Sequence, residues 1–213
     1  SLVGSEMCIR DSVGTGNKEA AKEGGKAAVE AAKAAGWTDI KCIEIAGVQG
    51  DATNTARMEG YREGVNEAGG EFLDAETQYA NATADLAVTA MEGIMSKYPE
   101  GVAIICSNND DMALAAARTA KDNPNYAKTI FLGFDGQKSA VEAVLNGELT
   151  MTAAQNNFDI GYKAVETIVK ILNGEADIST MPIEYTDVTK KYNKTICDDL
   201  GLTVPDGYEE IEG

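Results

Sequence analysis

Polar side chains follow four short apolar runs that are typical of buried strands. The segment after residues 39–46 carries Arg57, and the motifs NNDDM, DGQ and QNN after later runs carry Asn109, Asp135 and Gln155. Amides donate and accept hydrogen bonds, a carboxylate accepts from two hydroxyls, and a guanidinium donates in a rigid fork. This mixture suits a neutral, polyhydroxylated ligand. The alternative role of Asn109 and Asp135 is to close turns and cap helices, as short Asn and Asp side chains commonly do.

Histidine chemistry is excluded, because the sequence contains no histidine. This removes Ser-His-Asp and Cys-His catalysis and the commonest metal ligand. The four cysteines lie far apart without C-x-x-C spacing; we expect Cys42 and Cys106 to be small buried residues of strands, and a disulfide or a zinc site is the alternative. The turn GVQG at residues 47–50 matches neither the dinucleotide nor the P-loop pattern. We therefore predict a protein that is not an enzyme, with no catalytic residue, no metal site and no cofactor.

The charge of the chain limits its partners. Eighteen basic residues against 35 acidic ones give a net charge of −17. This charge repels a phosphate backbone, so nucleic acid is not an expected partner. The apolar runs also fall well short of the ~20 residues that a membrane-spanning helix requires.

Strand-like and helix-like segments alternate along the chain. We predict strands at residues 39–46, 71–77, 102–107, 129–134 and 150–154, and helices at residues 18–35, 55–68, 83–97, 111–121 and 138–145. This order predicts the α/β class, with a doubly wound parallel sheet and right-handed crossovers. Ligands of such sheets bind beyond the carboxyl ends of the strands, which is where Arg57, Asn109, Asp135 and Gln155 are expected.

Three segments do not fit this alternation. Residues 1–12 (SLVGSEMCIRDS) resemble the translation of a sequencing adapter, and we expect them to be non-native. A helix is predicted at residues 158–172, and its apolar face, which includes Ile160 and Ile168, has no obvious partner sheet. Beyond this helix the chain becomes polar and ends in an acidic tail.

Residues 13–189 resemble the later two-thirds of a type I periplasmic binding protein of the ribose and galactose kind. The resemblance is carried by VGTGN (13–17), ARMEGY (56–61), SNNDDMALAA (107–116), FLGFDG (131–136) and LTMTAAQNNFDIG (149–161). It implies that Arg57, Asn109, Asp135 and Gln155 contact sugar hydroxyls. Ribose binders often place an aromatic ring where this sequence has Asn81 or Ala82, so the resemblance does not imply a pentose.

The resemblance implies a role and a domain organisation. The implied role is the extracytoplasmic solute-binding component of an ABC importer, either in the periplasm or as a cell-surface lipoprotein. Such a protein closes two lobes on a mono- or small oligosaccharide. Its partners would be the sugar and the membrane permease, and the intact protein would be a monomer. The alternative, which shares this fold, is the effector-binding core of a sugar-responsive transcriptional repressor.

The lobes are assigned on the same resemblance. Residues 13–155 would form the C-terminal sugar-binding lobe, residues 156–183 a remnant of the N-terminal lobe, and residues 184–213 the return crossing and the acidic tail. The hinge would lie at Gln155, Asn156 and Thr186. The chain would then be an N-terminally truncated fragment that carries one wall of the binding cleft.

Overall fold

The structure is a computed structural model that describes residues 13–175 and 184–186. The sequence-based assignments for residues 1–12 and for the acidic tail lie outside the described residues. The chain divides into two compact units. The described part of the larger unit is residues 17–154, and that of the smaller unit is residues 13–16, 155–175 and 184–186.

A parallel sheet forms the centre of the larger unit. Its strands are β2 (Lys41–Ala46), β3 (Glu71–Phe72), β4 (Gln78–Tyr79), β5 (Ile104–Ser107), β6 (Ile130–Asp135) and β7 (Met151–Ala154). They follow the order β3-β2-β5-β6-β7, and β4 also pairs with β2. Every pair is parallel. Because each parallel connection requires a crossover, helices lie on both faces, and the predicted doubly wound α/β fold is confirmed.

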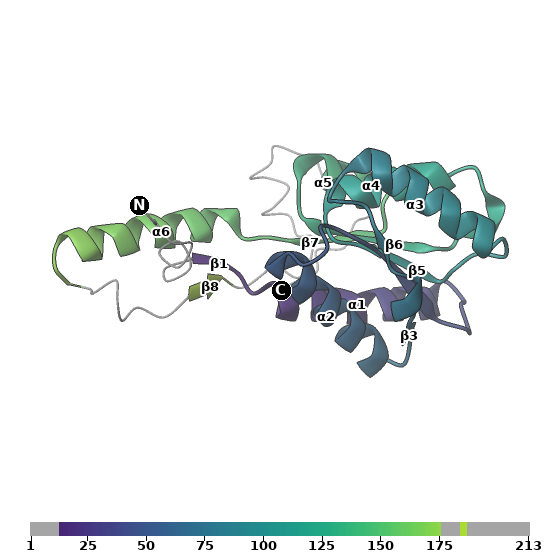
Figure 1. Cartoon of the computed structure of the whole chain (residues 1–213), viewed down its shortest axis with the longest axis horizontal. Coiled ribbons are helices and arrows are strands. Elements are labelled where there is room, and N and C mark those ends of the chain that lie inside the picture. Colours follow the sequence, from purple (N-terminus) through teal and green to yellow (C-terminus); the bar gives the residue numbers. More distant parts are fainter. Residues whose placement is uncertain (1–12, 176–183, 187–213) are drawn as a thin grey trace. The chain divides into compact units, whose positions relative to one another are not determined.

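The helices of the larger unit form a layer on each face of this sheet (Figure 1). Helices α1 (Asn17–Ala34) and α2 (Ala52–Glu67) cover one face. The other face is covered by α3 (Ala84–Lys97), α4 (Asp110–Ala120) and α5 (Lys138–Leu145). Apolar side chains of both helix layers pack against the strands and bury them. Met91 of α3, for example, lies in one buried cluster with Ile43 and Ile105 of the sheet. All the strand carboxyl ends therefore meet at one edge of a rigid platform.

Glycines allow α1 and α2 to pack in close contact. A Cβ atom on Gly60 would collide with the main-chain oxygen of Lys18, and one on Gly64 with that of Lys22. The two glycines are one helical turn apart, so they form a smooth strip along α2. Arg57 precedes Gly60 by less than a turn, so this contact fixes the part of α2 that carries the guanidinium.

The strand predicted at residues 71–77 is wrong as a single element. Strand β3 ends at Phe72, a 3-10 helix covers Asp74–Glu76, and β4 resumes the pairing with β2. The main chain turns at Leu73, whose carbonyl accepts from the Glu76 N–H. The residues of the short helix do not pair with β2, so this edge strand is interrupted between β3 and β4.

Two cysteines are confirmed as buried residues of strands. Cys42 and Cys106 are free and fully enclosed on neighbouring strands, with their Sγ atoms 3.5 Å apart. Across the described ranges, no helix is long and apolar enough to span a membrane.

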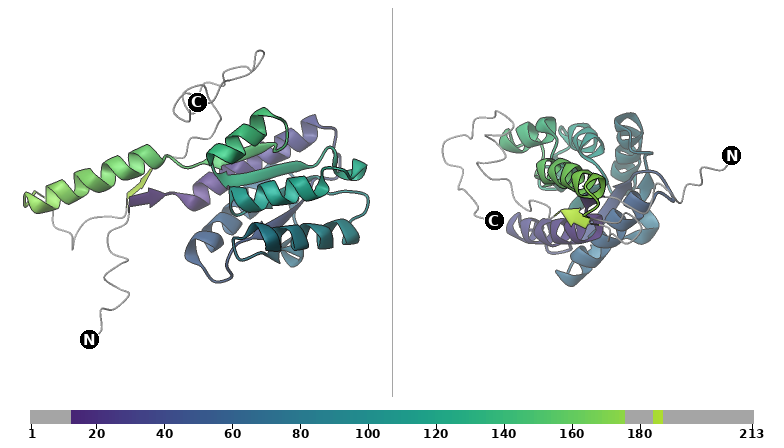
Figure 2. Two further views of the ribbon diagram at one scale, coloured as in Figure 1. Left: turned by 90° about the horizontal axis from the view of Figure 1, so that it is seen from above. Right: turned by 90° about the vertical axis from the view of Figure 1, so that its left-hand side faces the viewer.

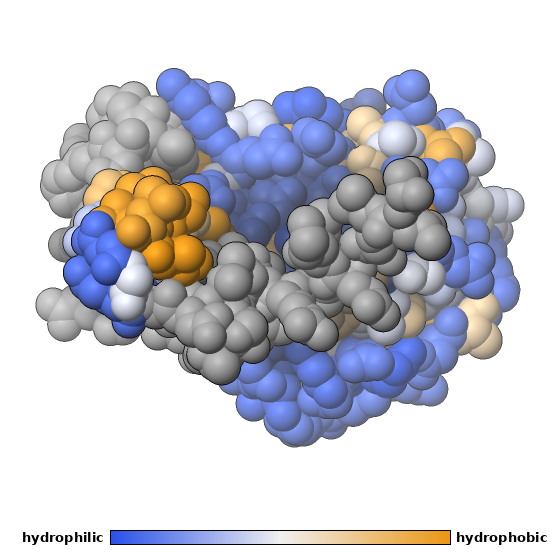
Figure 3. All heavy atoms as spheres, turned by 60° about the vertical axis from the view of Figure 1, so that its left-hand side comes forward, coloured by the Kyte–Doolittle hydropathy of each residue, from blue (hydrophilic) through white to orange (hydrophobic). Residues whose placement is uncertain are grey.

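The smaller unit contains a short sheet and one helix. Strands β1 (Val13–Thr15) and β8 (Glu184–Thr186) pair in parallel, and α6 (Asn157–Leu172) contacts both (Figure 2). The outer face of α6 is apolar and exposed; its end residues Phe158 and Leu172 are each 79% exposed. The exposed apolar side chains of α6 form a hydrophobic patch (Figure 3). The helix predicted at residues 158–172 is thus confirmed, and its outer face packs on no described residue.

Candidate functional site

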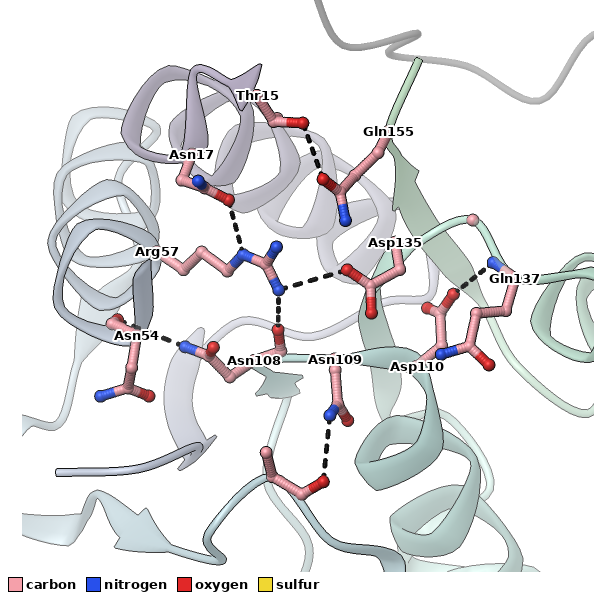
Figure 4. A network of polar contacts seen from close by, with 12 residues as sticks. Thr15, Asn17, Asn54, Arg57, Asn108, Asn109, Asp110, Asp135, Gln137 and Gln155 are labelled. Carbon is pink, nitrogen blue, oxygen red and sulfur yellow. Dashed lines mark hydrogen bonds and ion pairs between the residues drawn. The ribbon is translucent and has the colours of Figure 1, made fainter. Parts of the chain in front are cut away.

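Arg57 occupies the centre of a polar network at the carboxyl ends of β2, β5 and β6 (Figure 4). Its Nε atom donates to Asn17 Oδ1 at 2.8 Å, and its Nη1 atom donates to the main-chain oxygen of Asn108 at 2.6 Å. The guanidinium carbon lies 3.8 Å from the centre of the Phe134 ring. Two acceptors and an aromatic face fix a planar donor that is only 7% exposed.

Asp135 is the second member of this network. Its Oδ1 atom lies 3.3 Å from Arg57 Nη1, and its side chain is 22% exposed. The residue ends β6 with a φ of 119°, which is unusual for any residue other than glycine. Such backbone strain costs about 1–3 kcal/mol and is typical of functional positions. The strained backbone places the carboxylate beside the guanidinium and leaves it partly open to solvent.

Asn109 caps a helix with the same side chain that was nominated for ligand contact. Its Oδ1 atom accepts from the Met112 N–H at 2.9 Å at the start of α4, and its Nδ2 atom donates to the Ala82 oxygen at 3.2 Å. Ala82 and its neighbour Asn81 both have positive φ values, of 59° and 48°. The half-buried Asn109 amide is therefore held by two protein partners, and it retains one further N–H and one further lone pair for a ligand.

Gln155 belongs to the smaller unit, where it directly follows β7 in the sequence. Its Oε1 atom accepts from the hydroxyl of Thr15 at 2.7 Å. The next residue, Asn156, caps α6 by accepting from the Asp159 N–H. Thr186, the third predicted hinge residue, pairs through its backbone with Thr15. Gln155 thus follows the last strand of the larger unit, while Asn156 and Thr186 lie at the ends of α6 and β8.

Sequence reasoning missed the side chains that hold Arg57 in place. Asn17 was nominated only as part of a motif, and Asn108 contributes a main-chain carbonyl, which no residue type predicts. Asn54 links the network to β2, because its Oδ1 atom accepts from the Gly47 N–H at 2.6 Å and its own carbonyl accepts from Asn108 Nδ2 at 3.3 Å. Asn108 directly follows β5, and this position after a strand is the signal that could have identified it.

Asp110, the first residue of α4, carries a fully buried carboxyl group. Its oxygens accept from the Gln137 N–H at 2.8 Å and from the Thr152 hydroxyl at 2.6 Å. Burial raises the pKa of the Asp110 carboxyl to about 7, and nearby Asp135 adds to this, whereas the two hydrogen bonds oppose it. The carboxyl therefore joins α4 to the loop after β6 and to β7.

The arrangement can bind a small polar molecule. Within the described residues, Arg57 Nη2 makes no hydrogen bond, so it can donate to a ligand in the guanidinium plane. Asp135 supplies a partly exposed acceptor beside it. A donor and an acceptor fixed side by side match a molecule whose neighbouring hydroxyls both donate and accept.

Comparison with known proteins extends these observations. The family described as "Periplasmic binding protein domain" matches residues 9–176. The ribose import binding protein of Escherichia coli (strain K12) is 33% identical over 169 residues, which cover 79% of this chain and 55% of that protein. The chain thus spans about half the length of the curated relatives that it matches.

Solved structures share the fold. An ABC transporter periplasmic solute-binding protein from Actinobacillus succinogenes 130z with bound D-allose has a TM-score of 0.71 and 23% identity, over 83% of this chain and 60% of that one. The complex of the transcriptional regulator CelR with cellobiose has a TM-score of 0.68 and 22% identity, over 84% of this chain and 52% of that one. The chain therefore belongs to the periplasmic binding protein domain family, with the fold of its type I members.

Proposed function

We propose that this chain is part of the extracytoplasmic solute-binding component of an ABC importer and that it binds a mono- or small oligosaccharide. The whole protein would close two lobes on the sugar and deliver it to a membrane permease. It would act as a monomer that binds without catalysis. Relatives named as ribose and D-allose binding proteins support this class of ligand.

One observation carries the proposal: the Arg57 guanidinium is immobilised at the strand ends with Nη2 still available, next to the partly exposed carboxylate of strained Asp135. Immobilised donors lose little conformational entropy when a ligand binds, so such contacts favour affinity. Each charge-assisted hydrogen bond to a hydroxyl can contribute about 1.5–3 kcal/mol where water is excluded. Asn109 and Gln155 would add two amides to the set.

The domain assignment is part of the same proposal. Residues 13–155 would supply the C-terminal lobe, and α6, within residues 156–183, would belong to the other lobe. Gln155, Asn156 and Thr186 would form the hinge, because they stand at the ends of helices and strands, where a change in φ and ψ disturbs little packing.

The alternative is the effector-binding core of a sugar-responsive transcriptional repressor. The likeness to CelR is at 22% identity and supports the fold that both classes share. The relatives above 30% identity are named as import or periplasmic binding proteins, which favours the importer. The net charge of −17 points the same way, since a DNA-bound protein gains affinity from basic residues.

The ligand can be tested on the full 213-residue chain. Ligand-observed NMR with D-ribose, D-allose, D-galactose and L-arabinose detects binding up to millimolar dissociation constants. We expect at least one sugar to bind, and Arg57→Ala and Asp135→Ala each to weaken that binding at least tenfold. Arg118→Ala is the matched control, because Arg118 forms an exposed pair with Glu148 on another part of the larger unit. Equal binding by all three variants would place the ligand elsewhere.

A further inference from the structure

Glu44 is a carboxyl group buried in the middle of the sheet. It lies on β2, is 0% exposed, and its Oε2 atom has no hydrogen-bond partner among the described residues. Its Oε1 atom accepts from Asn108 Nδ2 at 3.4 Å. Buried polar atoms are normally hydrogen-bonded, so a requirement for packing alone would favour an apolar residue here.

The residue that Glu44 contacts is also the residue that holds Arg57. The main-chain oxygen of Asn108 accepts from Arg57 Nη1 at 2.6 Å, while its Nδ2 atom donates to both Glu44 Oε1 and the Asn54 oxygen. Asn108 is itself 6% exposed, so it has little room to adopt another rotamer. A continuous path of contacts thus connects the core of the sheet to the guanidinium.

We propose that Glu44 is a positioning residue for Arg57: its Oε1 atom orients the Asn108 side chain, and Asn108 presents its main-chain oxygen to the guanidinium. This inference rests on the proposed function in so far as Arg57 binds the sugar. It assigns the buried carboxyl to the binding site, although it cannot touch the ligand.

The surroundings of Glu44 favour the neutral acid. Charged and titratable neighbours come from three other elements: Tyr61 and Arg62 from α2, Asp74 from the 3-10 helix, and Cys106 from β5. The Arg62 guanidinium is paired with Asp74, so it neutralises Glu44 only in part. Burial raises the pKa of Glu44 to about 8, against the opposing effects of the Asn108 hydrogen bond and Arg62. Above this pH, ionisation would place a charge without a contacting cation in the core and disturb Asn108.

Two substitutions in the full 213-residue chain separate positioning from packing. Glu44→Gln keeps an oxygen acceptor at the Oε1 position but cannot ionise. Glu44→Met keeps a similar volume and shape but has no acceptor. The probe is the ¹H–¹⁵N resonance of the Arg57 Nε–H group, which needs no ligand, and its titration between pH 6 and pH 9.5.

We expect the Arg57 resonance of the unsubstituted chain to shift with a midpoint near pH 8, the pKa of Glu44. This shift should be absent in Glu44→Gln, whose spectrum at pH 7 should match that of the unsubstituted chain. In Glu44→Met the resonance should move or broaden at pH 7. Identical Arg57 resonances in both variants, or a titration with its midpoint near pH 8 that persists in Glu44→Gln, would overturn the inference. Should Glu44→Met fail to fold, the titration of Glu44→Gln decides alone.

A second measurement uses D-ribose as the probe in ligand-observed NMR. Binding at least tenfold weaker in Glu44→Met than in Glu44→Gln supports the inference, and equal binding by both contradicts it. A failure of every sugar to bind the unsubstituted chain counts against the proposed function, and the Arg57 resonance still decides whether Glu44 positions Arg57.

Discussion

Arg57 Nη1 lies 3.3 Å from Asp135 Oδ1, and the two side chains come from the start of α2 and from the end of β6. One member is almost buried and the other is held by a strained backbone. The Arg57 guanidinium is almost enclosed, whereas the Asp135 carboxylate is partly exposed to solvent. The pair therefore joins two elements of the fold, and under the proposed function it would also present a donor and an acceptor to a sugar.

Arg57→Ala should lower the free energy of unfolding by about 1–3 kcal/mol, since it removes the hydrogen bond to the buried Asn108 carbonyl and the ion pair with Asp135. Urea denaturation monitored by circular dichroism measures this loss. Arg118→Ala breaks an exposed pair and should cost less than about 1 kcal/mol. A loss no larger than that of Arg118→Ala would mean that Arg57 serves the ligand alone.

Gly60→Ala should destabilise the larger unit by about 1–3 kcal/mol, because the new methyl group would collide with the main-chain oxygen of Lys18 and force α1 away from α2. Gly93→Ala is the matched control in the middle of α3, where nothing lies within 4 Å of the added Cβ. It should stabilise by about 0.5–1 kcal/mol through helix propensity. The urea midpoint should shift down in Gly60→Ala and up in Gly93→Ala. Shifts in the same direction for both variants would contradict the close packing of α1 and α2.

Asp110→Asn should cost about 1–3 kcal/mol, because an amide NH₂ would replace an oxygen that accepts from the Gln137 N–H or the Thr152 hydroxyl. Asp111→Asn changes the adjacent, exposed carboxylate in the same helical turn and should cost less than about 1 kcal/mol. Thermal unfolding of the two variants under one buffer condition gives the comparison. Equal losses would indicate that both residues act only on the helix dipole.

The free energy of unfolding should depend on pH through Glu44. The pKa of Glu44 rises from 4.5 to about 8 on folding, so the folded state binds more protons in this interval and stability falls as the pH rises through it. One proton corresponds to a slope of about 1.4 kcal/mol per pH unit at most. Glu44→Gln should remove this part of the slope, as measured by urea denaturation between pH 5 and pH 9.

Glu63→Gln is a control, because folding lowers the pKa of Glu63 whereas it raises that of Glu44. A hydrogen bond from the Lys18 ammonium lowers the pKa of Glu63, so its contribution is present at neutral pH and lost as the pH falls. The substitution should therefore alter only the acidic side of the profile. An unchanged slope between pH 5 and pH 8 in Glu44→Gln would mean that Glu44 is already ionised in the fold.

The alternation of elements was predictable because apolar periodicity records which faces are buried. Helix α5 begins and ends as predicted, and β5, β6 and β7 differ by one or two residues at their ends. The failure at residues 71–77 has a local cause. Only Phe72 of the residues in β3 and β4 is buried, so period and composition carry little information along this interrupted edge.

The sequence allowed prediction of those residues of the candidate site that contribute a polar side chain near the end of a strand. Arg57 and Asp135 do come together, as their positions after β2 and β6 suggested. The carbonyl of Asn108 could not be predicted, since every residue has one. Glu44 also escaped notice, because an acidic residue in a strand usually faces solvent, whereas a parallel sheet between two helix layers has no solvent-facing side.

The parallel pairing of β1 with β8 sets an order of events during synthesis. Val13 pairs with Glu184, so β1 leaves the ribosome about 170 residues before its partner. At roughly 5–20 residues per second, this delay is on the order of 10–30 s. The strands of the larger unit are all complete by Ala154. A nascent chain stalled soon after that residue would carry a finished large sheet, while the small sheet would still await its second strand.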